Sequence, residues 1–228
     1  MVLQVFLKFI LLMIKNVKLV NGTRYWGSAI YWRGDNGLLS NSIIENNYNE
    51  HIRYGYGGGI FWWALNGKII NCTFKNNHIA DYGGAIYVNG DGIKISNCLF
   101  ENNYVIESYT RVQGGGAIYT DGGNHIIENC TFIGNSAPKS YGGAIKRGTG
   151  SLSVNFNIFI NNTALRVNHI LGVNYEYTNK NIFYLNSISD IDSCAEEVDI
   201  IKLFDNNTFI VNGNIISKDD YLLTFDSN

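Results

Sequence analysis

The feature that most constrains the fold of this chain is a two-part phrase that returns five times with a fixed internal spacing. The first half is a Gly-rich turn that ends in an apolar residue, as in Gly83-Gly84-Ala85-Ile86. The second half is centred on a Phe or Ile, as in Asn97-Cys98-Leu99-Phe100-Glu101-Asn102-Asn103. The two apolar residues stand at 30 and 44, 60 and 74, 86 and 100, 118 and 132, and 145 and 159, always 14 residues apart. Such a repeat indicates a solenoid whose units stack on one another.

The stretch between one copy and the next varies in length. From each second apolar residue to the next Ile it covers 16, 12, 18 and 13 residues, which gives a period of 26 to 32. A constant half and an elastic half predict a rigid wall joined by loops that tolerate insertion. The period is too short for a four-stranded propeller blade.

The constant half shows the two-residue alternation of strands. Ile93, Ile95, Cys98 and Phe100 can all face inward if the chain bends at Asn97. The position five residues before each Phe place is always aliphatic: Leu39, Ile69, Ile95, Ile127 and Val154. We therefore predict an all-β fold, a single parallel β-helix of about seven coils, in which like residues stack on like at about 4.8 Å.

Asparagine recurs three residues after each Phe place. This position holds Asn47, Asn77, Asn103, Asn135 and Asn162, and two fainter copies continue it as Asn186 and Asn212. We expect these residues to form a bend with left-handed backbone geometry and to stack their amides into a hydrogen-bonded ladder. The Gly pair is expected to turn the chain at another corner, where Ala-Ile then starts the next strand.

The chain divides into three segments by pattern. Residues 1–15 hold a short apolar run and are interpreted as an N-terminal cap or a degenerate export segment, 16–212 as the β-helix repeats, and 213–228 as a C-terminal capping tail. The run from Val2 to Ile14 is shorter than the roughly 20 apolar residues of a membrane-spanning helix. We expect no spanning segment.

Composition argues against one class of partner. The net charge is −2, and charged residues make up 16% of the chain without any basic run. The electrostatic footprint of a nucleic-acid-binding protein is missing, so we expect no nucleic acid as a partner.

The paired motifs resemble a known group of repeat proteins. Gly-Gly-Ala-Ile, as at 83–86, and Phe-x-x-Asn, as at 100–103, are similar to the repeats of chlamydial polymorphic outer membrane proteins and of adhesin-like proteins of methanogenic archaea. The resemblance covers roughly residues 16 to 212. It implies a right-handed β-helix, a location at the cell surface or outside the cell, and a role in adhesion or as an exported passenger domain.

Three cysteines occupy one position of successive coils. Cys72, Cys98 and Cys130 are interpreted as small buried side chains in an internal ladder, although neighbours at about 4.8 Å also lie within reach of a disulfide. Cys194 stands outside the ladder. Because CxxC pairs and matching histidines are missing, we assign neither metal-binding nor cofactor-binding residues.

Enzymes that act on polysaccharides share this architecture and are the main alternative. Their chemistry requires converging carboxylates or an acidic calcium site. The candidates Asp35, Asp91 and Asp121 each lie in a Gly- or Asn-rich turn and are interpreted as turn residues. We therefore assign no catalytic residue and predict that the chain is not an enzyme.

Aromatic residues form two further rows. Tyr31, Phe61, Tyr87 and Tyr119 directly follow the core Ile, and Trp26, Tyr56, Tyr82 and Tyr141 precede it by four residues. If Ile faces inward, its neighbour should face solvent, so we expect a ridge of rings that contacts a ligand. The alternative is cross-coil stacking without a ligand.

These observations favour a non-catalytic β-helix module that binds a glycan or a host or cell-surface protein through its outer face, and the resemblance implies that it is surface-exposed or secreted. The alternatives are a polysaccharide lyase or glycoside hydrolase, and a structural remnant without a partner.

Overall fold

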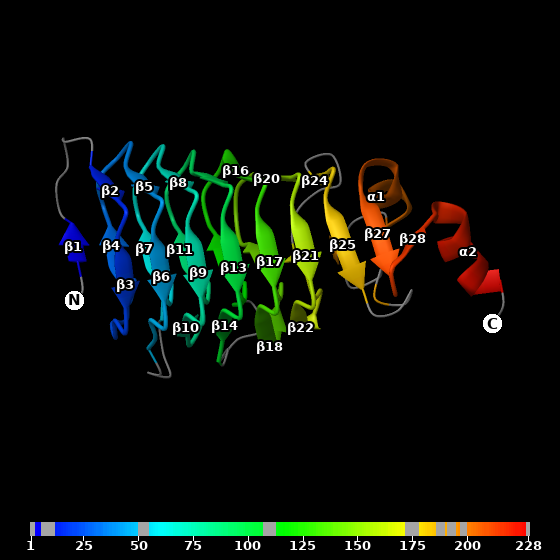
Figure 1. Cartoon of the computed structure of the whole chain (residues 1–228), viewed down its shortest axis with the longest axis horizontal. Coiled ribbons are helices and arrows are strands. Elements are labelled where there is room, and N and C mark those ends of the chain that lie inside the picture. Colours follow the sequence, from blue (N-terminus) through cyan, green and yellow to red (C-terminus); the bar gives the residue numbers. More distant parts are fainter. Residues whose placement is uncertain are drawn as a thin grey trace.

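The computed structural model describes residues 3–5, 12–49, 55–106, 113–171, 178–185, 190, 195–196 and 200–226. The described chain winds into a stack of coils that runs from β1 (Leu3–Val5) at one end to α2 (Lys218–Asp226) at the other (Figure 1). Successive coils pair as parallel strands throughout, and the only antiparallel pair among the described strands joins the last two. The predicted fold class, a right-handed parallel β-helix, is confirmed.

Four sheets run along the stack, and each takes one strand from each successive coil that contributes to it, apart from the last strand of the third sheet, which folds back antiparallel on its neighbour. The first has eight strands: β1, β4 (Ile30–Trp32), β7 (Ile60–Trp62), β11 (Ile86–Val88), β15 (Ile118–Thr120), β19 (Ile145–Arg147), β23 (Ile170–Leu171) and β26 (Ala195–Glu196). The second has seven: β2 (Met13–Lys15), β5 (Leu38–Ser40), β8 (Lys68–Ile70), β12 (Lys94–Ser96), β16 (His125–Glu128), β20 (Leu152–Asn155) and β24 (Thr178–Asn179).

The other two sheets complete each coil. The third has nine strands: β3 (Lys18–Val20), β6 (Ile43–Glu45), β9 (Thr73–Lys75), β13 (Leu99–Glu101), β17 (Thr131–Ile133), β21 (Ile158–Ile160), β25 (Ile182–Leu185), β27 (Thr208–Val211) and β28 (Asn214–Ile216). The fourth has four: β10 (His78–Ile79), β14 (Tyr104–Val105), β18 (Ser136–Tyr141) and β22 (Thr163–Arg166).

The core is built from columns of like residues, as the repeat predicted. Six phenylalanines form one unbroken stack with ring centroids 4.8–5.2 Å apart and planes within 12° of parallel: Phe74, Phe100, Phe132, Phe159, Phe183 and Phe209. The Ile that opens each first-sheet strand from β4 to β19 is fully buried, and so is the aliphatic residue of β5, β8, β12, β16 and β20. The predicted inward positions are confirmed.

The Asn ladder is confirmed for five residues, but its backbone geometry is displaced by one. Side-chain Nδ2–Oδ1 hydrogen bonds of 2.9–3.0 Å link Asn47, Asn77, Asn103, Asn135 and Asn162 in order. The left-handed residue of each bend is the one before, with φ of 54° at Asn46 and 53° at Asn76. This arrangement turns the ladder Asn inward, because the preceding residue absorbs the reversal of the chain.

The two C-terminal members of the predicted ladder do not extend it. Asn186 lies outside the described residues. Asn212 is exposed, with φ of 49°, in the tight turn between β27 and the antiparallel β28. The prediction for Asn212 is wrong because the chain reverses there and does not begin another coil.

The Gly pair turns the chain at the corner before the first sheet, as expected. Gly83 has φ of +64°, which favours glycine. A Cβ on Gly84 would lie 2.1 Å from the carbonyl oxygen of Gly116 in the next coil, so the neighbouring backbones leave no room for a side chain.

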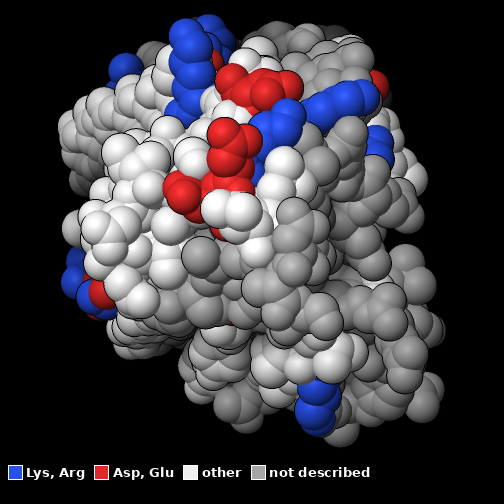
Figure 2. All heavy atoms as spheres, turned by 90° about the vertical axis from the view of Figure 1, so that its right-hand side faces the viewer, with Lys and Arg blue, Asp and Glu red and all other residues white. Residues whose placement is uncertain are grey.

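The two ends of the stack differ. Parallel pairing begins with β1 on β4 and β2 on β5, ahead of residue 16, where the repeats were expected to start. At the other end α1 (Ile200–Asn206) and α2 bury Leu203 and Tyr221 against the core. Seen from the α2 end, basic and acidic side chains lie next to one another and much of the described surface is uncharged (Figure 2). None of the helices in the described part of the chain has the length and apolar character needed to cross a membrane.

Candidate functional site

The aromatic residues that follow the core Ile lie outside the main core, but they are not exposed. Because Ile60 and Trp62 point inward, Phe61 between them points outward from the first sheet, and its equivalents do the same. The exposed fractions are only 2–7% for Tyr31, Phe61, Tyr87 and Tyr119. The prediction that these rings face solvent is therefore wrong.

The second aromatic row covers the first. Tyr56 lies with its ring centroid 5.6 Å from Phe61 and 5.1 Å from Tyr87, and Tyr82 lies 5.6 Å from Tyr87. Tyr56, Tyr82 and Tyr141 are half-buried, whereas Trp26 is 50% exposed. We call these eight residues the outer aromatic cluster.

Stacking in this cluster removes the ring faces that a ligand would use. Phe61 stacks on Tyr31 and on Tyr87, with 5.0 Å between ring centroids in both pairs. The Tyr87 hydroxyl donates a hydrogen bond of 2.8 Å to the Asp121 carboxylate. Burial, and then the Asp121 charge, raise the pKa of Tyr87 well above its ordinary value. The phenol therefore stays protonated as a donor, and the cluster packs the outer wall.

A different row, three residues after the core Ile, carries varied chemistry at the surface. It holds Arg33, Trp63, Asn89 and Asp121 in four successive coils. Each begins the turn that leaves the first sheet, and the backbone N–H of Trp63 donates to the carbonyl of Trp32 at 2.8 Å. Behind the row, the inward rings of Trp32 and Trp62 stack at 4.2 Å, so the turn rests on a rigid base.

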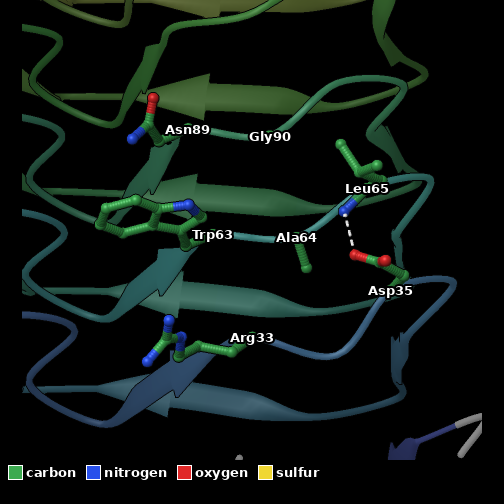
Figure 3. A pocket seen from close by; sticks show the side chains of 7 residues that line it. All are labelled: Arg33, Asp35, Trp63, Ala64, Leu65, Asn89 and Gly90. Carbon is green, nitrogen blue, oxygen red and sulfur yellow. Dashed lines mark hydrogen bonds between the residues drawn. The ribbon is translucent and has the colours of Figure 1, made fainter. Parts of the chain in front are cut away.

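Three members of this row line a surface groove of about 480 Å³ together with Asp35 and Leu65. We call it the Trp63 groove. Figure 3 shows Arg33, Trp63 and Asn89 one above another on neighbouring coils, while Asp35 and Leu65 lie further along the turn. Trp63 is 48% exposed, and its ring centroid lies 5.6 Å from that of Phe61 with a tilt of 46° between the rings.

The polar groups of the groove are available to a ligand. Within the described part of the chain, Arg33 forms no ion pair, and its guanidinium lies 5.7 Å from the centre of the Tyr31 ring. The indole N–H of Trp63 and the amide of Asn89 make no hydrogen bond to a described residue. The ladder asparagines differ, because their side-chain amides form hydrogen bonds to one another between coils.

The three candidate aspartates serve the turns, as the sequence indicated. Asp35 Oδ1 accepts the backbone N–H of Leu65 at 2.9 Å, and Asp91 Oδ1 accepts that of Gly123 at 2.7 Å. Asp121 accepts hydrogen bonds from the hydroxyls of Tyr87 and Thr149. Each carboxylate thus ties its own coil to a neighbouring one.

The cysteines form an internal ladder of hydrogen bonds. Cys72, Cys98 and Cys130 are buried free thiols, and the Sγ atoms of Cys98 and Cys130 accept the backbone N–H of the preceding cysteine at 3.5 and 3.4 Å. Burial is the largest cause that raises the pKa of Cys98, so the thiol stays protonated and unreactive. Cys194 lies outside the described residues. No group of three potential metal ligands occurs among the residues that the structure describes.

Sequence reasoning did not single out Arg33, Trp63 or Asn89, although a signal was present. Positions that hold the coils together repeat the same residue, whereas this position changes from cation to indole to amide to carboxylate. Such variation on an otherwise uniform wall indicates a position that does not form a column of like residues.

The comparisons with known proteins identify the fold family. The family model described as "Right handed beta helix region" matches residues 11–188. Neither the curated proteins nor the solved structures contain a significant match. The matched region holds the core columns, the outer aromatic cluster and the Trp63 groove. The chain belongs to the right-handed β-helix family.

Proposed function

We propose that this β-helix is a non-catalytic binding module that takes a glycan in the Trp63 groove. The observation that carries the proposal is a half-exposed indole between two side chains whose polar groups make no hydrogen bond or ion pair to a described residue. An indole face packs against the apolar C–H face of a sugar ring, while a few placed polar groups fix the hydroxyls. Arg33 and Asn89 supply those groups on either side of Trp63.

The use of the carboxylates supports binding without turnover. Glycoside hydrolysis requires two carboxyl groups that face the same bond. Among the described residues that line the groove, Asp35 is the one carboxylate, and one of its oxygens is held by the N–H of Leu65. The residues thus offer recognition, and a general acid with a matching nucleophile or base is not assembled there.

The resemblance of the repeats to polymorphic outer membrane proteins and adhesin-like proteins supports a location at the cell surface or outside the cell. A groove on the outer wall of a rigid rod is accessible there to glycans of a host or a neighbouring cell. Adhesion is the role that we propose for this binding.

A glycan array followed by calorimetry on the bound glycans tests the proposal. We expect binding without release of reducing ends or of unsaturated uronates. Trp63→Ala should weaken binding at least tenfold, since most of the apolar contact is lost. Trp26→Ala is the matched control, because Trp26 is equally exposed but does not line the groove.

Loss of binding in both tryptophan variants, or in neither, would contradict the assignment of the groove. Turnover of an acidic polysaccharide would favour the polysaccharide lyase or glycoside hydrolase alternative.

A further inference from the structure

A second groove, of about 510 Å³, lies at another corner of the coil, between the third and fourth sheets. Its walls are two parallel columns: the amides of Asn46, Asn76 and Asn102, and the rings of Tyr48, His78 and Tyr104. We call it the amide groove. It runs along the axis over successive coils, whereas the Trp63 groove lies at the turn between the first and second sheets.

The asparagines of this groove point outward for a backbone reason. Asn46 and Asn102 are exposed and Asn76 is half-buried, and each has a left-handed φ of 52–54°. The next residue in each coil is the fully buried ladder Asn. In each of these bends, the side chain of the left-handed Asn therefore points into the groove, and the side chain of the Asn that follows it points into the core.

These outer amides retain hydrogen-bonding capacity. Asn76 Nδ2 donates to Asn46 Oδ1 at 3.3 Å, but Asn76 Oδ1 accepts no hydrogen bond from a described residue. The amide of Asn102 makes none within the same part of the chain. In the next coil Gly134 takes the Asn position, and a Cβ there would lie 2.5 Å from Asn102 Oδ1. Gly134 therefore leaves the Asn102 amide the room to lie in the groove.

The ring column ends in an open aromatic face. His78 is stacked on both sides, 5.1 Å from Tyr48 and 4.5 Å from Tyr104 between ring centroids. Tyr48 is 37% exposed, and no other described ring stacks on it. In the preceding coil the residue next to Tyr48 is Gly22, which has no side chain to cover the ring. The carbonyl of Gly22 accepts the backbone N–H of Tyr48. Tyr48 is thus a rigidly backed platform beside the amides.

Among the described lining residues, His78 is the one titratable side chain, and its ring is stacked between Tyr48 and Tyr104; Asp, Glu, Lys and Arg do not occur there. The charges on the strands beside it neutralise one another across coils, with Lys18–Glu45 at 3.2 Å and Lys75–Glu101 at 3.0 Å. A ligand here is recognised by amides and a ring face and not by charge.

We propose that the amide groove binds a neutral, hydroxyl-rich oligosaccharide that runs along the solenoid axis, with one sugar on Tyr48 and its hydroxyls on Asn76 and Asn102. Amides can donate to and accept from sugar hydroxyls, and aromatic faces pack on sugar C–H groups. A peptide strand fits less well, because β13 is already paired on both sides by β9 and β17 and offers no open edge. This second site goes beyond the function proposed for Trp63 and uses none of its residues.

Calorimetry or ligand-observed NMR with neutral, unbranched hexasaccharides of glucose, mannose, galactose and N-acetylglucosamine tests this site in the full chain. Asn76→Gly removes the amide and keeps the left-handed bend, and it should weaken binding about fivefold, the factor for one net hydrogen bond. Tyr48→Leu should weaken it by at least that much. Asn71→Gly is the matched control, since Asn71 has φ of 55° and donates to Asn41 at 3.3 Å outside the groove.

The outcomes separate the two sites. Binding that survives in Trp63→Ala and is reduced in Tyr48→Leu and Asn76→Gly, with melting temperatures near the parent, supports the amide groove. Failure of all four probes to bind would overturn it, as would equal binding by the folded Tyr48→Leu and Asn76→Gly variants. Loss of neutral binding in Trp63→Ala alone would overturn the second site and leave the function proposed for Trp63 intact.

Discussion

Cys130 donates its backbone N–H to the side-chain oxygen of Asn157, 2.9 Å away, at the point where a column of thiols becomes a column of amides. On one side Cys130 Sγ accepts the N–H of Cys98. On the other, Asn157 donates its own N–H to Asn181 at 2.9 Å, and Asn181 to Asn207 at 3.0 Å. Thiol and amide thus perform one task, which is to accept the N–H of the preceding coil at a bend inside the core.

This equivalence predicts how Cys130 responds to substitution. Cys130→Asn keeps an acceptor for the Cys98 N–H, so we expect an unfolding free energy within about 1 kcal/mol of the parent. Cys130→Val has nearly the same shape but leaves that buried N–H unpaired, which should cost about 1–3 kcal/mol. Urea unfolding under reducing conditions measures both. A valine variant as stable as the parent would contradict the role of the thiol as an acceptor.

The exposed bend residue of the same corner supports a stabilising substitution. Phe156 has φ of 59° and is 51% exposed. The equivalent residue is an asparagine with left-handed φ in five preceding coils: Asn16, Asn41, Asn71, Asn97 and Asn129. Because asparagine tolerates this geometry better, Phe156→Asn should raise the free energy of unfolding by about 1 kcal/mol. The reciprocal Asn129→Phe should lower it by a similar amount. Thermal melts with opposite signs for the two variants are the expected result, and equal signs would contradict it.

Buried His169 predicts acid sensitivity. Burial lowers its pKa from 6.5 to about 4, against a smaller opposing effect of Asp190. The unfolded chain therefore takes up the proton near pH 6.5 and the folded chain only near pH 4. The stability contribution is complete above pH 6.5 and is lost as the pH falls to 4, about 3 kcal/mol in all.

His169→Gln is the variant that isolates this effect. Glutamine retains an acceptor for the Asn162 amide, which lies 3.4 Å from His169 Nδ1, and it does not titrate. Urea unfolding at several pH values should show a shallower loss of stability between pH 6.5 and 4 in this variant. His125, whose pKa burial also lowers, accounts for part of the remaining slope. An unchanged slope would rule out His169 as the source.

The burial of the outer aromatic cluster predicts a loss of stability when its centre is removed. Tyr87 is 6% exposed and contacts Tyr56, Phe61 and Tyr119, so Tyr87→Ser should lower the free energy of unfolding by about 3–4 kcal/mol. Trp26→Ser, at a ring that is 50% exposed, should change it by less than about 1 kcal/mol. If the two variants melt alike, the cluster is not packed as described.

The repeat spacing was sufficient to predict the coil and its core. The constant interval of 14 residues shows that Ile86 and Phe100 have equivalents at the same two points of the other coils. The alternation of strand residues then determines which neighbouring side chains face inward. The outward rows were less predictable. Alternation gives the direction of Tyr87 but not what lies over it, and Tyr56 and Tyr82 cover it from the corner that precedes the first sheet.

Other differences have local causes. The left-handed residue falls one place before each ladder Asn, a distinction that depends on the bend geometry and not on composition. The continuity from Cys130 to Asn157 was readable, since both stand two residues before a stacked Phe. The Trp63 groove required the structure, because its lining residues lie in three different coils.

The indole N–H resonance of Trp63 offers the most direct test of the proposed glycan binding. The chain has four tryptophans, of which Trp32 and Trp62 are fully buried and Trp26 lies outside the groove. Titration of ¹⁵N-labelled protein with a bound glycan from the array should shift the Trp63 indole signal in a saturable manner and leave those of Trp32 and Trp62 in place. A glycan that binds while the Trp63 signal stays unmoved would contradict the account.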